Sequence, residues 1–205
     1  MKKFLIMAAM VLSSVGAFAQ YSAGDITIQP KIGLNCSTLS GEGSDYKAGF
    51  VGGVEAEYHV SPLVGISAGV LYSMQGAKAK NAETDEGESF DLKMNFAYIN
   101  IPILANFYVA NGLALKAGIQ PAFKASAKVK VNDTSLSYDD YFGGRIGKSK
   151  SFDFSIPVGI SYEYANICLD ARYNIGVTKI TEEKPGYKSS RNNVFQLTLG
   201  YKFKL

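Results

Sequence analysis

The single histidine of the chain, His59, is the first candidate for chemistry. Glu55 and Glu57 precede it by four and two residues, so the three side chains share one face of an extended strand. A histidine beside carboxylates can serve as a general base that an acid orients. Because the sequence fixes no serine or cysteine nucleophile near His59, we interpret it as a polar interior residue. We therefore predict no catalytic residue, and we expect neither a cofactor nor a metal site.

Ten charged side chains form a second set of candidates, because they occupy the polar phase of alternating segments. They are Glu55, Glu57, Lys116, Lys124, Asp153, Glu163, Asp170, Arg172, Lys202 and Lys204. Enclosed charges need partners or water, since an unpaired buried charge is costly. We expect a lumenal network of salt bridges and water, with Arg172 as its hub because one guanidinium can bind two carboxylates. The alternative is that the same residues line a path for ions.

Eight segments must position these residues, and each alternates between apolar and polar residues with the period of a β-strand. They cover residues 26–36, 50–60, 64–73, 99–107, 113–124, 152–163, 169–178 and 194–205. In the last segment Phe195, Leu197 and Leu199 share the apolar phase, and Lys202 and Lys204 share the polar one. A terminal strand exposes an edge unless another strand pairs with it, so we expect it to close onto the first strand.

The connections between the segments alternate in length. Short turns fall at Ser61-Pro62, at Ala110-Asn111-Gly112 and around Ala165-Asn166. Longer polar links cover residues 37–46, 76–93, 132–150 and 181–193. Short turns at one end and long loops at the other are typical of outer-membrane barrels. The sequence thus predicts an all-β fold, an eight-stranded antiparallel up-and-down transmembrane β-barrel.

The distribution of charge separates a membrane barrel from a soluble sandwich or a lipocalin-like barrel. A soluble barrel would carry its charges on the outer phase, whereas here the apolar phase carries almost none. Lipid exposure explains this, because a lysine or arginine on the lipid face costs about 2–4 kcal/mol at the bilayer midplane. Tyrosines and phenylalanines near both ends of the segments resemble two interfacial girdles.

The first nineteen residues have the features of a secretory signal peptide. Lys2 and Lys3 precede an apolar run, and Ala17-Phe18-Ala19 offers a cleavage site. We expect residues 1–19 to be removed after export and residues 20–205 to form one barrel domain. Without Lys2 and Lys3 the chain carries 19 basic and 18 acidic residues, a balance that argues against nucleic acid as a partner.

Three strands carry a resemblance to a known family. Tyr98-Ile-Asn-Ile-Pro-Ile-Leu-Ala-Asn-Phe107, Leu169-Asp-Ala-Arg-Tyr-Asn-Ile-Gly176 and Phe195-Gln-Leu-Thr-Leu-Gly-Tyr-Lys-Phe203 are similar to strands of the Bacteroidetes outer-membrane β-barrel family, of the porin or PorT type. The resemblance covers residues 25–205. It implies residence in the outer membrane of a Gram-negative cell and insertion by the barrel-assembly machinery, but it supplies no settled function.

The third long loop is the best candidate for recognition of a partner. It combines the aromatic residues Tyr138, Tyr141 and Phe142 with Arg145 and further lysines. This mixture suits an anionic or protein surface, such as an extracellular protein or glycan. The alternative is that the strands extend above the membrane and the aromatic side chains pack on one another.

The two cysteines are predicted to remain separate thiols. Cys36 falls in the outward phase near the loop end of its strand, and Cys168 in the inward phase near a short turn. Side chains in those positions cannot reach disulfide geometry.

Together these features favour a non-enzymatic integral outer-membrane protein. We expect a lumen filled by side chains, contacts with outer-membrane lipids, and extracellular loops for structural or surface-interaction roles, because eight strands leave little more than room for side chains. A narrow porin-like channel for ions or small solutes is the alternative, and an outer-membrane enzyme is a more distant one.

Overall fold

The computed structural model describes residues 21–40, 45–83, 89–131, 134–142, 149–180 and 190–205, and it is almost entirely β-sheet. The predicted signal peptide lies outside the described residues. The strands are β1 (Ile26–Leu39), β2 (Lys47–Ser61), β3 (Val64–Glu83), β4 (Ser89–Asn100), β5 (Ile103–Ala110), β6 (Leu113–Val131), β7 (Thr134–Ser137), β8 (Phe152–Tyr164), β9 (Ile167–Gly176), β10 (Asn192–Tyr201) and β11 (Phe203–Lys204). A short helix, α2 (Tyr138–Phe142), follows β7. None of the described helices is long and apolar enough to span a membrane.

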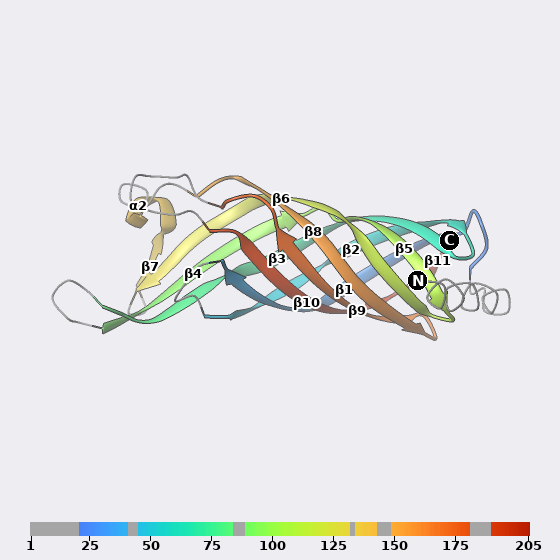
Figure 1. The fold of residues 1–205 in the computed structure, drawn as a ribbon, viewed down its shortest axis with the longest axis horizontal. Helices are drawn as coiled ribbons and strands as arrows, with labels where there is room; N and C mark the ends of the chain where they lie inside the picture. The colour runs from blue at the N-terminus through green and yellow to red at the C-terminus, as the bar shows by residue number, and fades with distance from the viewer. Residues whose placement is uncertain (1–20, 41–44, 84–88, 132–133, 143–148, 181–189) are drawn as a thin grey trace, which may run out of the picture.

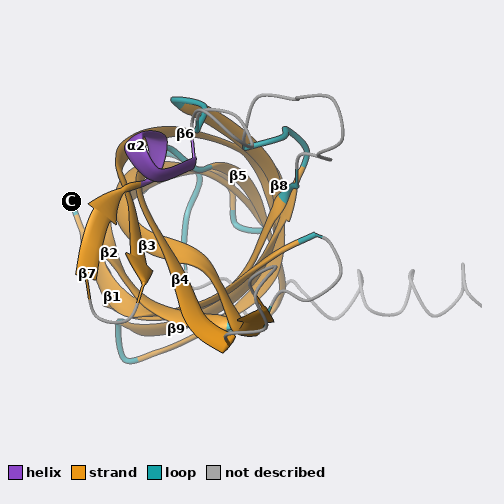
Figure 2. Ribbon diagram, turned by 90° about the vertical axis from the view of Figure 1, so that its left-hand side faces the viewer, coloured by secondary structure: helices purple, strands orange, loops and turns teal. Residues whose placement is uncertain are grey.

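These segments fill eight positions around a closed antiparallel barrel. β4 and β5 act as one strand, since both pair with β3 and β6. β10 and β11 likewise share one position and both pair with β1, which closes the ring seen in Figure 2. The order around the ring is β1, β2, β3, β4/β5, β6, β8, β9 and β10/β11. The predicted eight-stranded up-and-down barrel is confirmed.

The barrel has two different ends, which Figure 1 shows at opposite sides of the long axis. The turn end carries the three short connections and the C-terminus, and β7 and α2 lie at the other end, the loop end. At the β8–β9 turn Ala165 and Asn166 have φ values of 48° and 69°, the left-handed conformation that a two-residue hairpin turn requires. At the β2–β3 turn the Ser61 hydroxyl accepts hydrogen bonds from the amides of Leu63 and Val64.

A break between β4 and β5 leaves the hydrogen-bond ladder intact. Pro102 has no amide hydrogen to donate. Its carbonyl nevertheless accepts from Gly69 N at 3.1 Å, and the amide of Ile101 donates to Pro121 O at 2.8 Å. The neighbouring strands therefore stay joined across the break.

Two of the predicted long loops are wrong in their bounds. Residues 76–93 were expected to be a loop, yet β3 continues to Glu83 and β4 begins at Ser89. Residues 132–150 contain β7 and α2. The prediction relied on alternation of apolar and polar residues, and above the membrane a sheet needs no apolar outer phase. Backbone pairing alone continues the strands there, for example between Lys78 and Lys93.

The polarity of the barrel is the reverse of that of a soluble protein. Ile32 and Leu34 are 64% and 66% exposed, and the outward residues of the other strands are similarly exposed and apolar. Most of the predicted inward charges are buried. Cys36 is exposed and Cys168 is buried, and both are free thiols, as predicted.

Candidate functional site

A cluster of five charged side chains crosses the middle of the lumen, and Arg172 on β9 is its centre. Its two terminal nitrogens donate to the two carboxylate oxygens of Glu55 on β2, at 2.6 and 2.8 Å. Nη2 also donates to Asp170 at 2.7 Å. β9 and β2 are three positions apart around the ring, so this bidentate contact spans the interior.

Two lysines complete this mid-barrel charge cluster, which comprises Lys31, Glu55, Lys116, Asp170 and Arg172. Lys31 on β1 lies 2.7 Å from Glu55 and 3.6 Å from Asp170. Lys116 on β6 lies 2.9 Å from Asp170. All five side chains are at most 3% exposed. Each acid therefore contacts at least two cations, and four strands are tied together through their side chains.

Glycines leave the space that the cluster occupies. A Cβ atom placed on Gly69 would lie 2.4 Å from Glu55 Cγ, and one on Gly159 would lie 2.9 Å from Arg172 Cγ. Both separations are shorter than non-bonded carbon atoms tolerate. The same Cβ atoms would also lie 2.6 Å from Val54 O and 2.4 Å from Ala171 O, so glycine at these inward positions is required by the charged side chains and by the neighbouring backbone together.

A second charged group, the turn-end cluster, surrounds Lys202. Its ammonium lies 2.8 Å from Glu57 and 3.1 Å from Glu163. It also donates to the Tyr108 hydroxyl at 2.9 Å, and that hydroxyl donates to Glu57 at 2.8 Å. Tyr21, which precedes β1, donates its hydroxyl to Glu163. The N-terminal end of the described chain therefore folds into the lumen and packs against this cluster.

His59 lies in the wall of the turn-end cluster and is fully buried. Its ring stacks on Tyr21 with centroids 4.0 Å apart and planes at 18°. Within the described part of the chain neither ring nitrogen has a hydrogen-bond partner. The two carboxylates that could orient it are engaged elsewhere, Glu55 by Arg172 and Glu57 by Lys202. His59 therefore packs as an aromatic ring, and no described acid forms a hydrogen bond with it.

Lys124 and Asp153 lie closer to the loop end, apart from both clusters. Lys124 donates to the Ser149 hydroxyl at 2.6 Å and lies 3.5 Å from Asp139 of α2. Asp153 accepts from the Thr178 hydroxyl at 2.5 Å. These contacts attach the segment around α2 and the segment after β9 to the barrel wall.

Lys204 does not belong to the lumenal network, which corrects the prediction. Its side chain is 56% exposed and lies 2.6 Å from Asp25 at the turn end. It follows the inward phase of its strand, but the strand has already reached the rim of the barrel at this point. The hydrogen bond from Lys204 holds the pKa of Asp25 below its ordinary value.

Three members of the interior were not predicted from the sequence, namely Lys31, Tyr21 and Tyr108. Lys31 could have been found, because it alternates with Ile28, Ile32 and Leu34 on the first strand. Tyr108 also lies in the polar phase of its strand. Tyr21 lies outside any strand, so no periodicity marks it.

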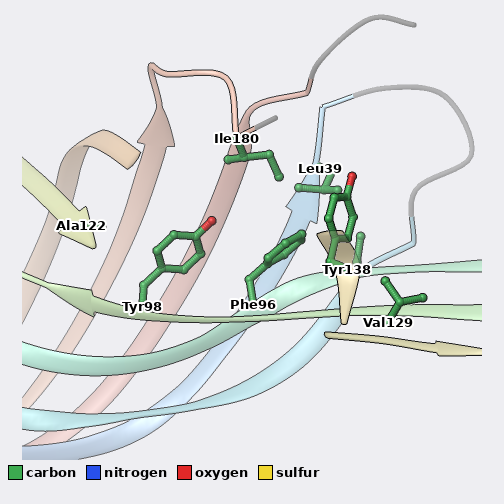
Figure 3. Close-up of a cluster of buried hydrophobic side chains, with 8 residues drawn as sticks. Leu39, Phe96, Tyr98, Ala122, Val129, Tyr138 and Ile180 are labelled. Carbon is green, nitrogen blue, oxygen red and sulfur yellow. The ribbon is translucent and has the colours of Figure 1, made fainter. Parts of the chain in front are cut away.

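The loop end of the interior is apolar. A cluster of buried side chains fills it (Figure 3), formed by Leu39, Ala77, Phe96, Tyr98, Ala122, Val129, Tyr138 and Ile180. The ring of Tyr138, from α2, packs on Phe96 with centroids 5.4 Å apart. We call this group the loop-end apolar cluster.

The predicted recognition surface of the third loop must therefore be corrected. Tyr138 is only 2% exposed, because α2 turns its side chain into the loop-end apolar cluster. It cannot contact an external partner in this arrangement. Tyr141 and Phe142 lie in α2, but their side chains are outside the described part of the structure, and Arg145 lies outside the described residues altogether.

Comparisons with known proteins agree with this architecture. A family described as "Outer membrane protein beta-barrel domain" matches residues 18–182 of the chain. Among solved structures, the attachment invasion locus protein Ail of Yersinia pestis, in complex with the heparin analogue sucrose octasulfate, is 16% identical with a TM-score of 0.51, over 88% of this chain and 99% of that one. Neisserial surface protein A is 17% identical with a TM-score of 0.47, over 88% and 97%. No curated protein sequence matches the chain.

The likeness to Ail shows the fold, and the family match shows the relationship. The matched residues run from before β1 to beyond β9 and so include most of the barrel. Outward apolar and inward polar side chains are the pattern that a barrel in a bilayer requires. The chain belongs to the outer membrane protein β-barrel domain family and is an integral outer-membrane barrel.

Proposed function

We propose that this protein is a non-enzymatic barrel whose lumen is closed by its own side chains and whose role is structural or in surface interactions. The observation that carries the proposal is the mid-barrel charge cluster. Its contacts join β2 to β9 and β6 to β9, so side chains from separate parts of the wall meet inside the lumen. An eight-stranded barrel is wide enough for little beyond such side chains.

The pairing of charges supports closure over conduction. Glu55, Asp170, Glu57 and Glu163 each lie within 3.1 Å of a lysine or arginine nitrogen. A permeating ion would have to separate these pairs, and breaking a buried pair costs about 3–5 kcal/mol. The loop-end apolar cluster adds a third barrier in series, because ions are poorly stabilised among apolar side chains.

One observation favours a narrow channel as a second candidate. Among the described residues, the buried amides of Asn100, Asn174 and Gln196 have no hydrogen-bond partner at either end. Groups of this kind are satisfied by water, and a row of waters between the charged and apolar layers could carry small solutes. This candidate requires the mid-barrel charge cluster to open.

Conductance of the folded barrel in a planar bilayer tests the two candidates. We expect no reproducible current steps from the wild-type protein. Arg172→Ala should also remain silent, because the turn-end cluster and the loop-end apolar cluster still close the lumen on either side of the gap that it leaves. Lys204→Ala is the matched control, since it removes an exposed cation outside the lumen. Wild-type steps whose ion selectivity changes in Arg172→Ala, but not in Lys204→Ala, would overturn closure and establish the channel.

We further propose that the protein is exported with cleavage after residue 19 and belongs to the Bacteroidetes porin or PorT type. The charged and apolar pattern of residues 1–19 supports the first statement. The strands around Ile101-Pro102 and Ala171-Arg172 support the second. N-terminal sequencing of protein isolated from outer membranes tests the cleavage, with Gln20 expected as the first residue.

A further inference from the structure

Four lysines lie on the outer face of the sheet near the loop end, and we call them the lysine face. Lys78, Lys93 and Lys130 are directly opposite one another across β3, β4 and β6. Lys128 lies on the same face of β6, opposite Asn95. Lys93, Lys128 and Lys130 are exposed and Lys78 is partly so. Like charges directly opposite on neighbouring strands repel, so this row destabilises the free protein.

Packing on the other side of the same strands holds the lysines outward. Ala77 and Val129 are fully buried in the loop-end apolar cluster, and Met94 packs against it. Side chains alternate along a strand, so the lysines next to these three residues must point away from the lumen. The lysines therefore cannot be moved apart by a rotation of their strands, and their mutual repulsion is a fixed property of this part of the sheet.

The lysines of the lysine face differ from those of the interior in the partners that the described residues give them. Lys31, Lys116 and Lys202 each lie within 2.9 Å of a carboxylate oxygen. Among the described side chains, no carboxylate forms an ion pair with a lysine of this face. Asp45 bonds to Lys78 through the main chains of both residues, yet their side chains form no salt bridge.

The position of the face matches the headgroup layer of the outer leaflet. Toward the middle of the barrel the same outward phase carries Met74 and Tyr72 on β3 and Phe123 on β6, all exposed and apolar. From Met74 to Lys78 the strand rises about 13 Å. The distance along the membrane normal is shorter, because barrel strands tilt by about 40°. Lysine side chains can also extend toward an interface while their aliphatic stems cover apolar surface.

We propose that the lysine face binds the phosphate groups of anionic lipids in the outer leaflet. Phosphate oxygens would neutralise the opposed ammonium groups, and the exposed hydroxyl of Ser137, opposite Lys128, is a further donor. The ligand is a membrane lipid rather than a soluble polyanion, because the face adjoins the lipid-facing apolar surface. This inference concerns the outside of the barrel and does not depend on whether the lumen conducts.

Reconstitution in vesicles tests the proposal with a double variant, Lys93→Gln with Lys130→Gln. Its matched control is Lys150→Gln with Lys204→Gln, which removes two exposed lysines elsewhere. In phosphatidylcholine vesicles the double variant should melt at a higher temperature than wild type, because the repulsion is gone. When the vesicles contain a fluorescent analogue of diphosphorylated lipid A, the affinity of the double variant for this analogue should be about thirty-fold lower than that of wild type. The affinity of the control variant should stay within twofold of wild type.

Three results would overturn the proposal. The first is unchanged affinity for the lipid A analogue in the double variant, and the second is an equal loss in the control. The third is binding of soluble heparin that is as tight as lipid A binding and equally sensitive to the double variant, which would assign the face to a soluble polyanion. Both variants retain the mid-barrel charge cluster. The presence or absence of current steps in the conductance measurement therefore neither supports nor contradicts the binding of lipid A.

Discussion

The two halves of the barrel interior are filled in different ways. From the turn end to the middle, charged side chains pair across the lumen, with Arg172 and Lys202 at the centres of two clusters. At the loop end, aromatic and aliphatic side chains such as Phe96 and Tyr138 pack together. Charged pairs need particular atoms at particular distances, whereas apolar packing is non-directional. The difference predicts that the charged half fixes which strands face each other and that the apolar half tolerates changes of shape.

The largest effect is expected from Arg172→Met. It leaves Glu55 and Asp170 buried with fewer cations, so the free energy of unfolding should fall by about 3–5 kcal/mol. Urea unfolding of the barrel in vesicles measures this. The double variant Glu55→Gln with Arg172→Met should lose less than the sum of the single variants, because one unpaired charge is removed with its partner. A urea midpoint of Arg172→Met equal to that of wild type would rule out Arg172 as the centre of the charged half.

The matching change in the apolar half is Phe96→Ala. Removal of a buried aromatic side chain should lower the free energy of unfolding by about 3 kcal/mol. Phe96→Leu serves as the control and should cost less than about 1.5 kcal/mol, because apolar packing tolerates a change of shape. If Phe96→Leu lowered the free energy of unfolding as much as Phe96→Ala, the apolar half would depend on particular side-chain shapes as strongly as the charged half depends on particular pairs. The proposed difference between the two halves would then be wrong.

A smaller effect should follow from Gly69→Ala, which places a methyl group against Glu55 Cγ. Overpacking of this kind costs about 1–3 kcal/mol. Gly52→Ala is a suitable control, since its new methyl group would face outward and meet the movable ring of Phe50. The comparison of the two urea midpoints shows whether the charged half is as closely packed as its distances indicate. Equal midpoints would show a looser interior.

The smallest effect concerns the exposed pair Asp25 and Lys204 at the turn end. The pKa of Asp25 is lower in the folded protein than its ordinary value of about 3.9. Its contribution to stability is therefore present above that value and is lost as the pH falls through the folded pKa. Wild type should be slightly more stable than Asp25→Asn at pH 6, and the difference should shrink as the pH falls below the ordinary pKa of an aspartate. A stability difference that grows as the pH falls would contradict the lowered pKa of Asp25 in the folded protein.

Much of the fold could be predicted from the sequence, because the alternation of residues such as Leu113, Leu115 and Lys116 assigns them to opposite faces. The choice of partners inside the lumen could not. Arg172 and Glu55 are 117 residues apart, and their contact depends on the stagger between strands that no local pattern specifies. The sequence therefore identified most of the charged residues of the lumen, but not Lys31 and not the pairs that they form.

The lysine face was missed for a more local reason. Lys116 and Lys124 point inward, and continuation of the same phase would send Lys128 and Lys130 inward as well. The register between β4 and β6 shifts where Ala97 faces Ser126 and Tyr98 faces Lys124, which leaves Ala125 as an extra residue. One inserted residue exchanges the two faces of the strand beyond it. A bulge of this kind has no signature in the sequence pattern.

The pairing of β1 with β10 has a consequence for the order of events during assembly. Lys31 belongs to the first strand, whereas Asp170 and Arg172 belong to the seventh position of the ring. Lys31 gains full contact with both its acids only when the ring is shut, and until then it faces an open edge. The contacts of Lys31 with Asp170 and of Arg172 with Glu55 thus form only as the seam is sealed. A partly assembled barrel would expose unpaired charges to the hydrocarbon layer, which is energetically costly. We therefore expect few intermediates in the bilayer and an all-or-none closure of the ring.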